Sequence, residues 1–395
     1  KRKHSRTHTA ETEIMMELNE AREKINEIDE QLVKLFSSRM ELSSKIAEYK
    51  AEKNLPILDR TREREVLNKV ADLSGPELEN YSKVLFSTLF DLSRSYQNRL
   101  TKSESPLGAQ IQEALENTPK QFPTKVVAAC QGVEGAYSQQ ACDKIFSLPN
   151  IMYFRTFEGV FQAVEKGLCQ YGILPIENST AGSVNAVYDL MSRYHFYIAR
   201  SIRLRIEHSL LARTAVPLSK IKEVVSHEQA ISQCSAFLKN HPEIKVTVVE
   251  NTAAAAKMVA ESDRDDLAAI SSRSCAELYG LSTLSDTVQN SENNFTRFIC
   301  ISKKLEIYPG AGKTSLMLTV PHRPGSLYGV IARIAALGMN LTKLESRPIP
   351  GKDFEFMFYF DLDASIYDPE VVRLICELDS DLDEFAYLGS YSELF

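Results

Sequence analysis

Cysteine pairs, histidine clusters and long apolar runs are all missing from this 395-residue sequence. The seven cysteines are scattered without Cys-x-x-Cys spacing, and the seven histidines form no His-Glu-x-x-His motif. We therefore expect reduced cysteines in the core, no disulfide framework, no metal and no cofactor. Because no apolar run reaches the length of a transmembrane helix, we also expect no membrane partner and a cytoplasmic location.

An excess of positive charge is missing as well. Lysine and arginine number 46 against 53 aspartates and glutamates, which gives a formal net charge of −7. This balance argues against a nucleic-acid partner. The hydrophobic share of 44% and the chain length are those of a globular protein with two or three domains.

Three patterns follow one another along the chain. Residues 12–102 have helical periodicity, broken at "NLPI" and "SGPE", and a polar linker with an amphipathic piece covers 103–124. Over 125–303, short β-branched runs alternate with amphipathic helices, which predicts a two-lobed α/β domain with parallel sheets. Residues 314–391 have the order strand, helix, strand, strand, helix, strand, which predicts an α+β ferredoxin-like (βαββαβ) domain. The fold class is therefore multidomain, with an all-α domain first.

The first helix carries a heptad seam with a cation inside it. Apolar residues recur at steps of three and four from Ile14 to Tyr49, and Arg39 fills one of these places. A helix of about 40 residues is about 60 Å long, more than one small domain can cover. We therefore predict an intertwined dimer, so the protein is at least a homodimer. A buried guanidinium is costly unless an anion meets it, so Arg39 indicates an anion site.

A second cation shares the face of Arg39. Lys50 follows eleven residues later, within about 20° around the helix and about 16 Å along it, so both side chains can reach one ligand. Arg22 lies about 25 Å away along the axis and must come from the partner helix if it takes part. Such a pocket suits the rearrangement of a dianion by restraint and charge stabilisation. Taken singly, Arg22 and Lys50 are typical of a solvated helix face, and only Arg39 is set apart by its position in the seam.

The stretch "AREKINEIDEQLVKLFSSRMELSSKIAEYK", with "LPILDRTRERE" after it, resembles the helical chorismate mutase family over the whole first region. The resemblance implies that chorismate is the substrate and that Arg39, Lys50 and Gln97 are catalytic, with Lys50 and Gln97 at the ether oxygen. It implies that Glu63 binds the ring hydroxyl and gives Arg62 a less direct role. The implied substrate-binding residues are Arg22 of the other protomer, Arg39, Lys50, Asp59, Glu63, Ser93 and Gln97.

Polar turns follow several strands of the α/β region. They are "CQGVEGAYS" at 130–138, "PIENSTAGSV" at 175–184, "SHEQAISQC" at 226–234 and "ENTAAAA" at 250–256. Where a strand gives way to a helix, free backbone N–H groups can hold carboxylates. Each such turn is common by itself, and Thr296 in "NNFTRFIC" could simply be a β-branched strand residue.

Together, the turns and the motifs "PIENSTAGSV" and "FTRF" resemble the prephenate dehydratase family over the full α/β region. The resemblance implies that prephenate loses carbon dioxide and water and that Thr296 is the essential catalytic residue. A threonine hydroxyl is too weak an acid to ionise, so we expect it to hydrogen-bond the departing hydroxyl and relay a proton. Glu177 is either a proton source or structural. The expected substrate-binding residues are Asn178, Ser179, Thr180, Gln229, Arg297 and Phe298.

The last region contains "HRPGSLYGVIARIAALGMNLTKLESRP", which resembles an ACT regulatory domain. The resemblance implies allosteric binding of L-phenylalanine, and the alternative is a plain ferredoxin-like dimerisation domain. The implied ligand residues are Gly325, Ser326, Leu327, Asn340, Leu341, Glu345, Ser346 and Arg347.

The whole sequence therefore predicts a bifunctional enzyme that converts chorismate to prephenate and prephenate to phenylpyruvate, with feedback inhibition by phenylalanine. A sensor that binds an amino acid or keto acid without turnover is one alternative, and a dehydratase that acts on arogenate is another.

Overall fold

The structure is a computed structural model that describes residues 2–53, 55, 57–100, 105–349, 351 and 355–395, with side chains outside 2–17 and 98–100. Its contacts divide it into two units, Lys1–Glu104 with Pro324–Ala336, and Ser105–Arg323 with Leu337–Phe395. Pro56, the side chain of Ile14 and the predicted boundary at 102 and 103 lie outside the described part.

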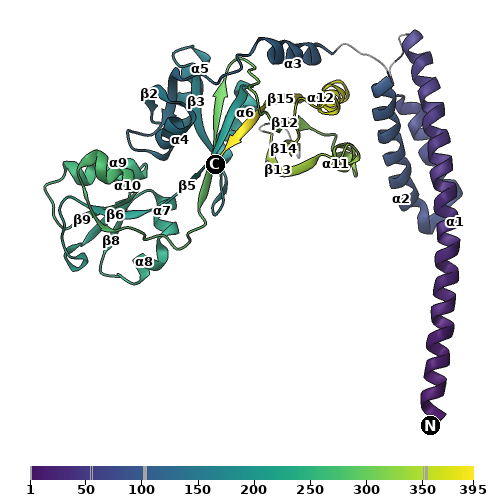
Figure 1. Cartoon of the computed structure of the whole chain (residues 1–395), viewed down its shortest axis with the longest axis horizontal. Coiled ribbons are helices and arrows are strands. Elements are labelled where there is room, and N and C mark those ends of the chain that lie inside the picture. Colours follow the sequence, from purple (N-terminus) through teal and green to yellow (C-terminus); the bar gives the residue numbers. More distant parts are fainter. Residues whose placement is uncertain (1, 54, 56, 101–104, 350, 352–354) are drawn as a thin grey trace. The chain divides into compact units, whose positions relative to one another are not determined.

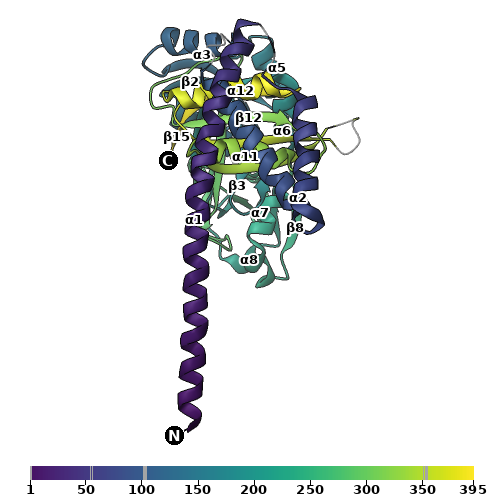
Figure 2. The same cartoon turned by 90° about the vertical axis from the view of Figure 1, so that its right-hand side faces the viewer.

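The first unit is built on two long helices, α1 (Arg2–Glu52) and α2 (Arg60–Leu100). They lie side by side, and the first part of α1 extends beyond α2 (Figures 1 and 2). The predicted break at "SGPE" is confirmed as a kink, because Gly75 has a φ of 72° and Pro76 follows it. Met40, Ser43 and Ala47 are buried, whereas the seam residues Leu32 and Leu35 are 54% and 68% exposed. Among the described side chains, the apolar residues of the predicted seam are therefore largely exposed within one chain.

The second unit contains a large mixed sheet with the strand order β13-β14-β12-β15-β5-β11-β3-β1-β2, and β4 (Gly182–Ser183) pairs with β3. Strands β1 (Lys125–Gln131), β2 (Leu148–Phe154) and β3 (Tyr171–Asn178) are parallel, as predicted. Strand β11 (Phe295–Ser302) is antiparallel to β3 and to β5 (Tyr197–Arg205), so the prediction of purely parallel sheets is wrong here. The hydrophobic pattern gives the burial of a strand but not its direction.

The smaller lobe, which contains the labelled strands β6, β8 and β9 in Figure 1, has the strand order β10-β6-β9-β7-β8. Strands β7 (Glu223–Ser226), β8 (Lys245–Val248) and β9 (Leu267–Ser271) are parallel, whereas β6 (Ser209–Ala212) is antiparallel to β9 and to β10 (Ser282–Ser285). Buried apolar clusters lie on both faces of each sheet, as predicted for helix-covered sheets. The helices of this region are α4 (Tyr137–Ile145), α5 (Phe157–Glu165), α6 (Asn185–Tyr194), α7 (Glu228–Gln233), α8 (Ser235–Lys239), α9 (Thr252–Glu261), α10 (Arg273–Tyr279) and the 3₁₀ turn Leu218–Lys220.

The C-terminal elements have the predicted order of strands and helices. They are β12 (Lys313–Thr319), α11 (Ser326–Ala336), β13 (Asn340–Pro348), β14 (Phe356–Asp363), α12 (Pro369–Asp381) and β15 (Phe385–Leu394). Strand β15 also pairs in parallel with β5, so the C-terminal strands extend the large sheet. The amphipathic piece of the linker is helix α3 (Pro106–Asn117), which begins at the Ser105 cap.

The cysteines are unbonded, and six of the seven are buried, which agrees with their predicted place in the core. Among the described residues, no cluster of three or more His, Cys, Asp or Glu side chains could hold a metal ion. Within the same residues, every helix is too short or too polar to cross a bilayer.

Candidate active sites

Arg39 on α1 is held against α2 by uncharged groups. Its Nη1 donates to the backbone oxygen of Leu89 at 3.2 Å and to the hydroxyl of Ser93, and its guanidinium lies 5.7 Å from the ring centre of Phe90. Burial lowers the pKa of Arg39, and the negative charge of Glu63 opposes this shift. In the part of the chain that the structure describes, Arg39 forms no ion pair, so its charge is available to a ligand.

Of the other predicted mutase residues, Lys50 lies in the last turn of α1, and Asp59, Ser93 and Gln97 lie at the start and on the buried face of α2. Lys50 donates to the backbone oxygen of Ile57 at 2.5 Å, and Asp59 caps α2 by accepting from the backbone N–H of Arg62 at 3.0 Å. Ser93 and Gln97 are buried on the same face of α2. Asp59 therefore has a structural role that the sequence analysis missed.

Glu63 has a partner that the sequence analysis did not identify. Arg94 forms ion pairs with Glu63 and with Asp91, and its side chain is 14% exposed. Arg62 instead pairs with Glu65 at 3.1 Å on the surface. The available signal for Arg94 was its spacing of three residues from Asp91, which places the two side chains side by side on a helix. Arg22 is exposed on the first half of α1, so its contribution to a partner's site stays a prediction.

Four of the predicted dehydratase residues, Asn178, Gln229, Thr296 and Phe298, line a cavity of about 510 Å³ in the second unit. Each of the predicted polar turns contributes to its wall. Residues from the turns are Gln131, Ala136, Tyr137, Ser138, Pro175, Asn178, Ala181, Gly182, Ser183, Val184, His227, Gln229, Ala230, Gln233, Glu250, Asn251 and Thr252, and Thr296 and Phe298 come from β11. The turns converge because the strands that precede them end at the same side of the two sheets.

Thr296 lies on the cavity wall and is 8% exposed. It faces Asn178 on the neighbouring strand, and the Nδ2 of Asn178 donates to Oγ1 of Thr296 at 2.9 Å. Thr180 and Ala181 donate their backbone N–H groups to Oδ1 of Asn178 at 3.0 and 2.9 Å. The Asx turn after β3 therefore holds Asn178 in place to orient Thr296.

Three further polar residues join this group, and the sequence analysis missed them. Asn294 accepts from Asn178 at 2.8 Å and donates to Gln233 at 3.0 Å, and His208 lies 2.9 Å from the same oxygen of Gln233. His208 and Gln233 line the cavity beside the predicted Gln229. Gln233 is one helical turn after Gln229, so the periodicity of "SHEQAISQC" could have identified it.

Ser179, Thr180 and Arg297 do not line the Thr296 cavity, which differs from their predicted role in binding substrate. The hydroxyl of Ser179 bonds the backbone of Asn293 and Phe295, and Thr180 donates its hydroxyl hydrogen to Asn178. Ser179 and Arg297 line a different cavity of about 500 Å³. Arg297 follows Thr296 on a β-strand, so its side chain points to the opposite face of the sheet.

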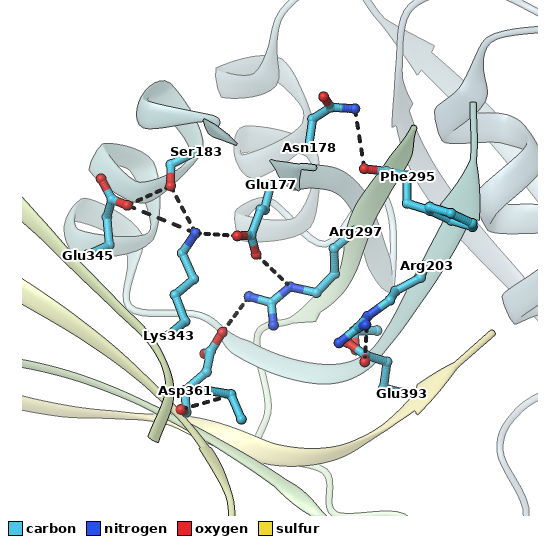
Figure 3. Close-up of polar contacts among 12 residues, drawn as sticks. Glu177, Asn178, Ser183, Arg203, Phe295, Arg297, Lys343, Glu345, Asp361 and Glu393 are labelled. Carbon is cyan, nitrogen blue, oxygen red and sulfur yellow. Dashed lines mark hydrogen bonds and ion pairs between the residues drawn. The ribbon is translucent and has the colours of Figure 1, made fainter. Parts of the chain in front are cut away.

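On that opposite face Arg297 belongs to a partly buried network of charges (Figure 3). It pairs with Asp361 of β14, and its Nε lies 3.7 Å from Glu177. Burial acts to lower the pKa of Arg297, but the Asp361 carboxylate raises it above its ordinary value. Lys343 of β13 pairs with Glu177 at 2.9 Å, so two ion pairs connect the strands of the Thr296 cavity with the C-terminal strands.

The predicted amino-acid ligands lie in two segments. Gly325 precedes α11 with a φ of 85°, and Ser326 and Leu327 begin that helix. Asn340, Leu341, Glu345, Ser346 and Arg347 lie on β13. Two of them contact the dehydratase region, because Glu345 accepts from Ser183 at 2.6 Å and Arg347 pairs with Asp189 at 3.0 Å.

Comparison with known proteins adds independent information on both regions. Residues 21–98 match the family model of chorismate mutase type II, and residues 128–306 match that of prephenate dehydratase. A prephenate dehydratase from Arthrobacter aurescens, solved in complex with L-Phe, is 28% identical with a TM-score of 0.62, and the match covers 68% of this chain and 90% of that chain.

Two curated relatives differ in how much of the chain they match. The arogenate dehydratase/prephenate dehydratase 2 of Arabidopsis thaliana is 34% identical, over 71% of this chain and 75% of its own length. The bifunctional chorismate mutase/prephenate dehydratase of Escherichia coli K12 is 31% identical over 378 residues, which cover 94% of this chain and 95% of the relative. Both the helical region and the α/β region thus have their counterparts in one relative, and the chain belongs to the family of bifunctional chorismate mutase/prephenate dehydratases.

Proposed function

We propose that this enzyme of phenylalanine biosynthesis uses the Arg39 site to rearrange chorismate and the Thr296 cavity to convert prephenate to phenylpyruvate. The observation that carries the proposal is the hydrogen bond from Asn178 to Thr296 in a cavity walled by the predicted polar turns. The product of the first site is then the substrate of the second.

At the mutase site, uncharged partners hold Arg39 in place without neutralising it. A carboxylate of chorismate would supply the missing anion, and Lys50 and Gln97 would stabilise the ether oxygen as its bond to carbon breaks. Because the reaction is a rearrangement of one molecule, restraint and charge stabilisation suffice, and no nucleophile is required.

A second copy of the chain completes the mutase site in this proposal. Leu32, Leu35 and Leu42 are all at least half exposed, and they lie on the stretch of α1 between Arg22 and Lys50. Burial of this seam against the partner's α1 would stabilise an intertwined dimer and bring the partner's Arg22 to the site. We expect this dimer to act in the cytoplasm.

At the dehydratase site, Thr296 would donate a hydrogen bond to the hydroxyl that leaves prephenate. The bond between the ring and the carboxylate breaks to release carbon dioxide, the bond between the ring and the hydroxyl breaks as well, and the ring becomes aromatic. Donation from Thr296 stabilises the negative charge that develops on the departing oxygen. Asn178 and Gln229 would orient the substrate.

We assign the C-terminal elements to a ferredoxin-like ACT domain that binds L-phenylalanine. The strand order β13-β14-β12-β15 supports this assignment, and so does the L-Phe complex of the Arthrobacter relative. Residues Glu345, Ser346 and Arg347 lie on the strand that carries Lys343. A ligand that shifts β13 would therefore act on Glu177, and through Arg297 on the strand of Thr296.

Incubation of the purified chain with chorismate tests both activities at once. Phenylpyruvate, detected by its absorbance in alkali, is the expected product. Accumulation of prephenate would contradict the dehydratase assignment, and unchanged chorismate would leave the sensor alternative. Competition between prephenate and arogenate separates the two possible dehydratase substrates, with prephenate expected to be preferred.

A further inference from the structure

A continuous chain of uncharged side chains leads from Thr296 to His208 along the cavity wall. In order, Thr296 is followed by Asn178, Asn294, Gln233 and His208, with successive distances of 2.9, 2.8, 3.0 and 2.9 Å. His208 is only 2% exposed, and it lines the cavity. The network reaches a histidine to which the proposed mechanism gives no role.

The backbone fixes which side-chain atoms donate and which accept at the Asn178 end of this hydrogen-bond chain. The N–H groups of Thr180 and Ala181 can only donate, so the side-chain atom of Asn178 that they contact must be its oxygen. The amide nitrogen of Asn178 then faces Thr296 at 2.9 Å and Asn294 at 2.8 Å, with the Phe295 oxygen further away at 3.3 Å. Asn178 is therefore the donor to both side chains.

The direction can be followed from Asn294 to the histidine. Asn294 uses its oxygen to accept from Asn178, so its nitrogen donates to the oxygen of Gln233. The Nε2 of His208 faces that same oxygen, so Nε2 must carry a hydrogen. The Nδ1 atom then has a lone pair and no hydrogen, and among the described residues it is buried without a hydrogen-bond partner. Burial also lowers the pKa of His208, although the bond to Gln233 opposes this, so the neutral ring is favoured.

The direction of the chain decides what Thr296 can do. Because the oxygen of Thr296 accepts from Asn178, the hydroxyl hydrogen of Thr296 is left free for another acceptor. If donors and acceptors were reversed along these hydrogen bonds, Asn178 would present its oxygen to Thr296. The hydroxyl hydrogen of Thr296 would then be donated to Asn178 and not to a substrate. We propose that His208 is a positioning residue of the dehydratase. It donates from Nε2 to the oxygen of Gln233, so the amide nitrogen of Gln233 faces the Thr180 hydroxyl at 3.0 Å and supports the Asn178 orientation that leaves the Thr296 hydrogen for the departing hydroxyl.

This inference rests on the proposed role of Thr296, and two variants of His208 in the full chain test it. His208→Gln places an amide donor where Nε2 lies, so it should keep most of the prephenate turnover. His208→Phe keeps the ring shape without the donor, and kcat should fall about tenfold or more with a smaller change in KM. His241→Phe is the matched control, because His241 lies outside the cavity, with its ring centre 5.0 Å from that of Phe237, and should tolerate the change. The thermal unfolding of each variant reports whether the dehydratase region is folded, because the mutase residues belong to the other unit.

Nitrogen NMR of histidine-labelled protein gives a readout that a purely structural role would not affect. The signal that disappears in His208→Gln should belong to a neutral ring with its hydrogen on Nε2. A ring with its hydrogen on Nδ1, equal loss of kcat in both His208 variants, or normal kcat in His208→Phe would overturn the proposal. Wild-type protein that does not turn over prephenate would contradict the proposed function. The nitrogen signal would still show whether Nε2 of His208 donates to Gln233.

Discussion

The helical site and the Thr296 cavity differ in charge and in completeness. Around Arg39, the cationic groups Lys50 and Arg94 lie on two helices whose apolar seam is largely exposed within one chain. Around Thr296, the bonded partners are uncharged amides and an imidazole, and the second unit alone encloses the cavity. A dianion that rearranges needs opposing charge, whereas a hydroxyl that departs needs a directed hydrogen bond. The helical region thus suits catalysis by charge stabilisation, and the Thr296 cavity suits catalysis by a directed hydrogen bond.

The largest expected effects come from removing the central residue of each site. Thr296→Val should reduce dehydratase kcat about a hundredfold to a thousandfold, because it removes the hydroxyl but keeps the shape. Chorismate consumption, measured on the same protein, should be unchanged. Thr296→Ser is the matched control and should retain activity, since it keeps the donor. A near-normal rate for Thr296→Val would remove this residue from the mechanism.

Arg39→Ala tests the other half of the comparison. We expect mutase activity to fall about a thousandfold, because the cation that meets the substrate carboxylate is lost. Turnover of added prephenate should continue at the normal rate. Loss of both activities would mean that Arg39 is needed for folding, and this would contradict the separation of the two sites.

A smaller effect is expected at the charged network that connects the dehydratase with the C-terminal strands. Lys343→Met removes the ion pair with Glu177, and about tenfold more phenylalanine should then be needed for half-inhibition of the dehydratase. The uninhibited rate should hardly change. Lys245→Met is the control, because Lys245 pairs with Glu223 at 3.1 Å in the smaller lobe, outside this network. Identical inhibition curves for the two variants would show that Lys343 does not transmit the signal.

Sequence reasoning located the cavity because its wall consists of local turns. The motifs around Asn178, Gln229 and Asn251 each contain a strand end and a helix start, and these signals lie within a few neighbouring residues. It assigned Arg297 to the substrate because the residue stands beside Thr296 in "FTRF". The period of two along a strand was the available signal that Arg297 faces the other way.

Other features could not be predicted because they depend on distant partners. Strand β5 carries Arg200, Arg203 and Arg205, which interrupt its apolar pattern, and its pairing with β11 joins residues about 100 positions apart. His208 has no motif that indicates a site, and only the fold brings it to Gln233, whereas Asn294 stands in "NNFTRFIC" two positions before Thr296. The network of Glu177, Arg297, Lys343 and Asp361 likewise joins strands from two parts of the chain.

Subunit mixing tests most directly whether the helical site needs a second chain while the Thr296 cavity does not. Arg22→Ala and Lys50→Ala proteins should each lack mutase activity and keep full dehydratase activity. After random exchange, half of the dimers are mixed and one of two sites in each is intact, so about a quarter of wild-type mutase activity should return. Exchange is followed independently with two differently tagged chains. No recovery of mutase activity despite complete exchange would contradict the account, because Arg22 would then not be supplied by the partner.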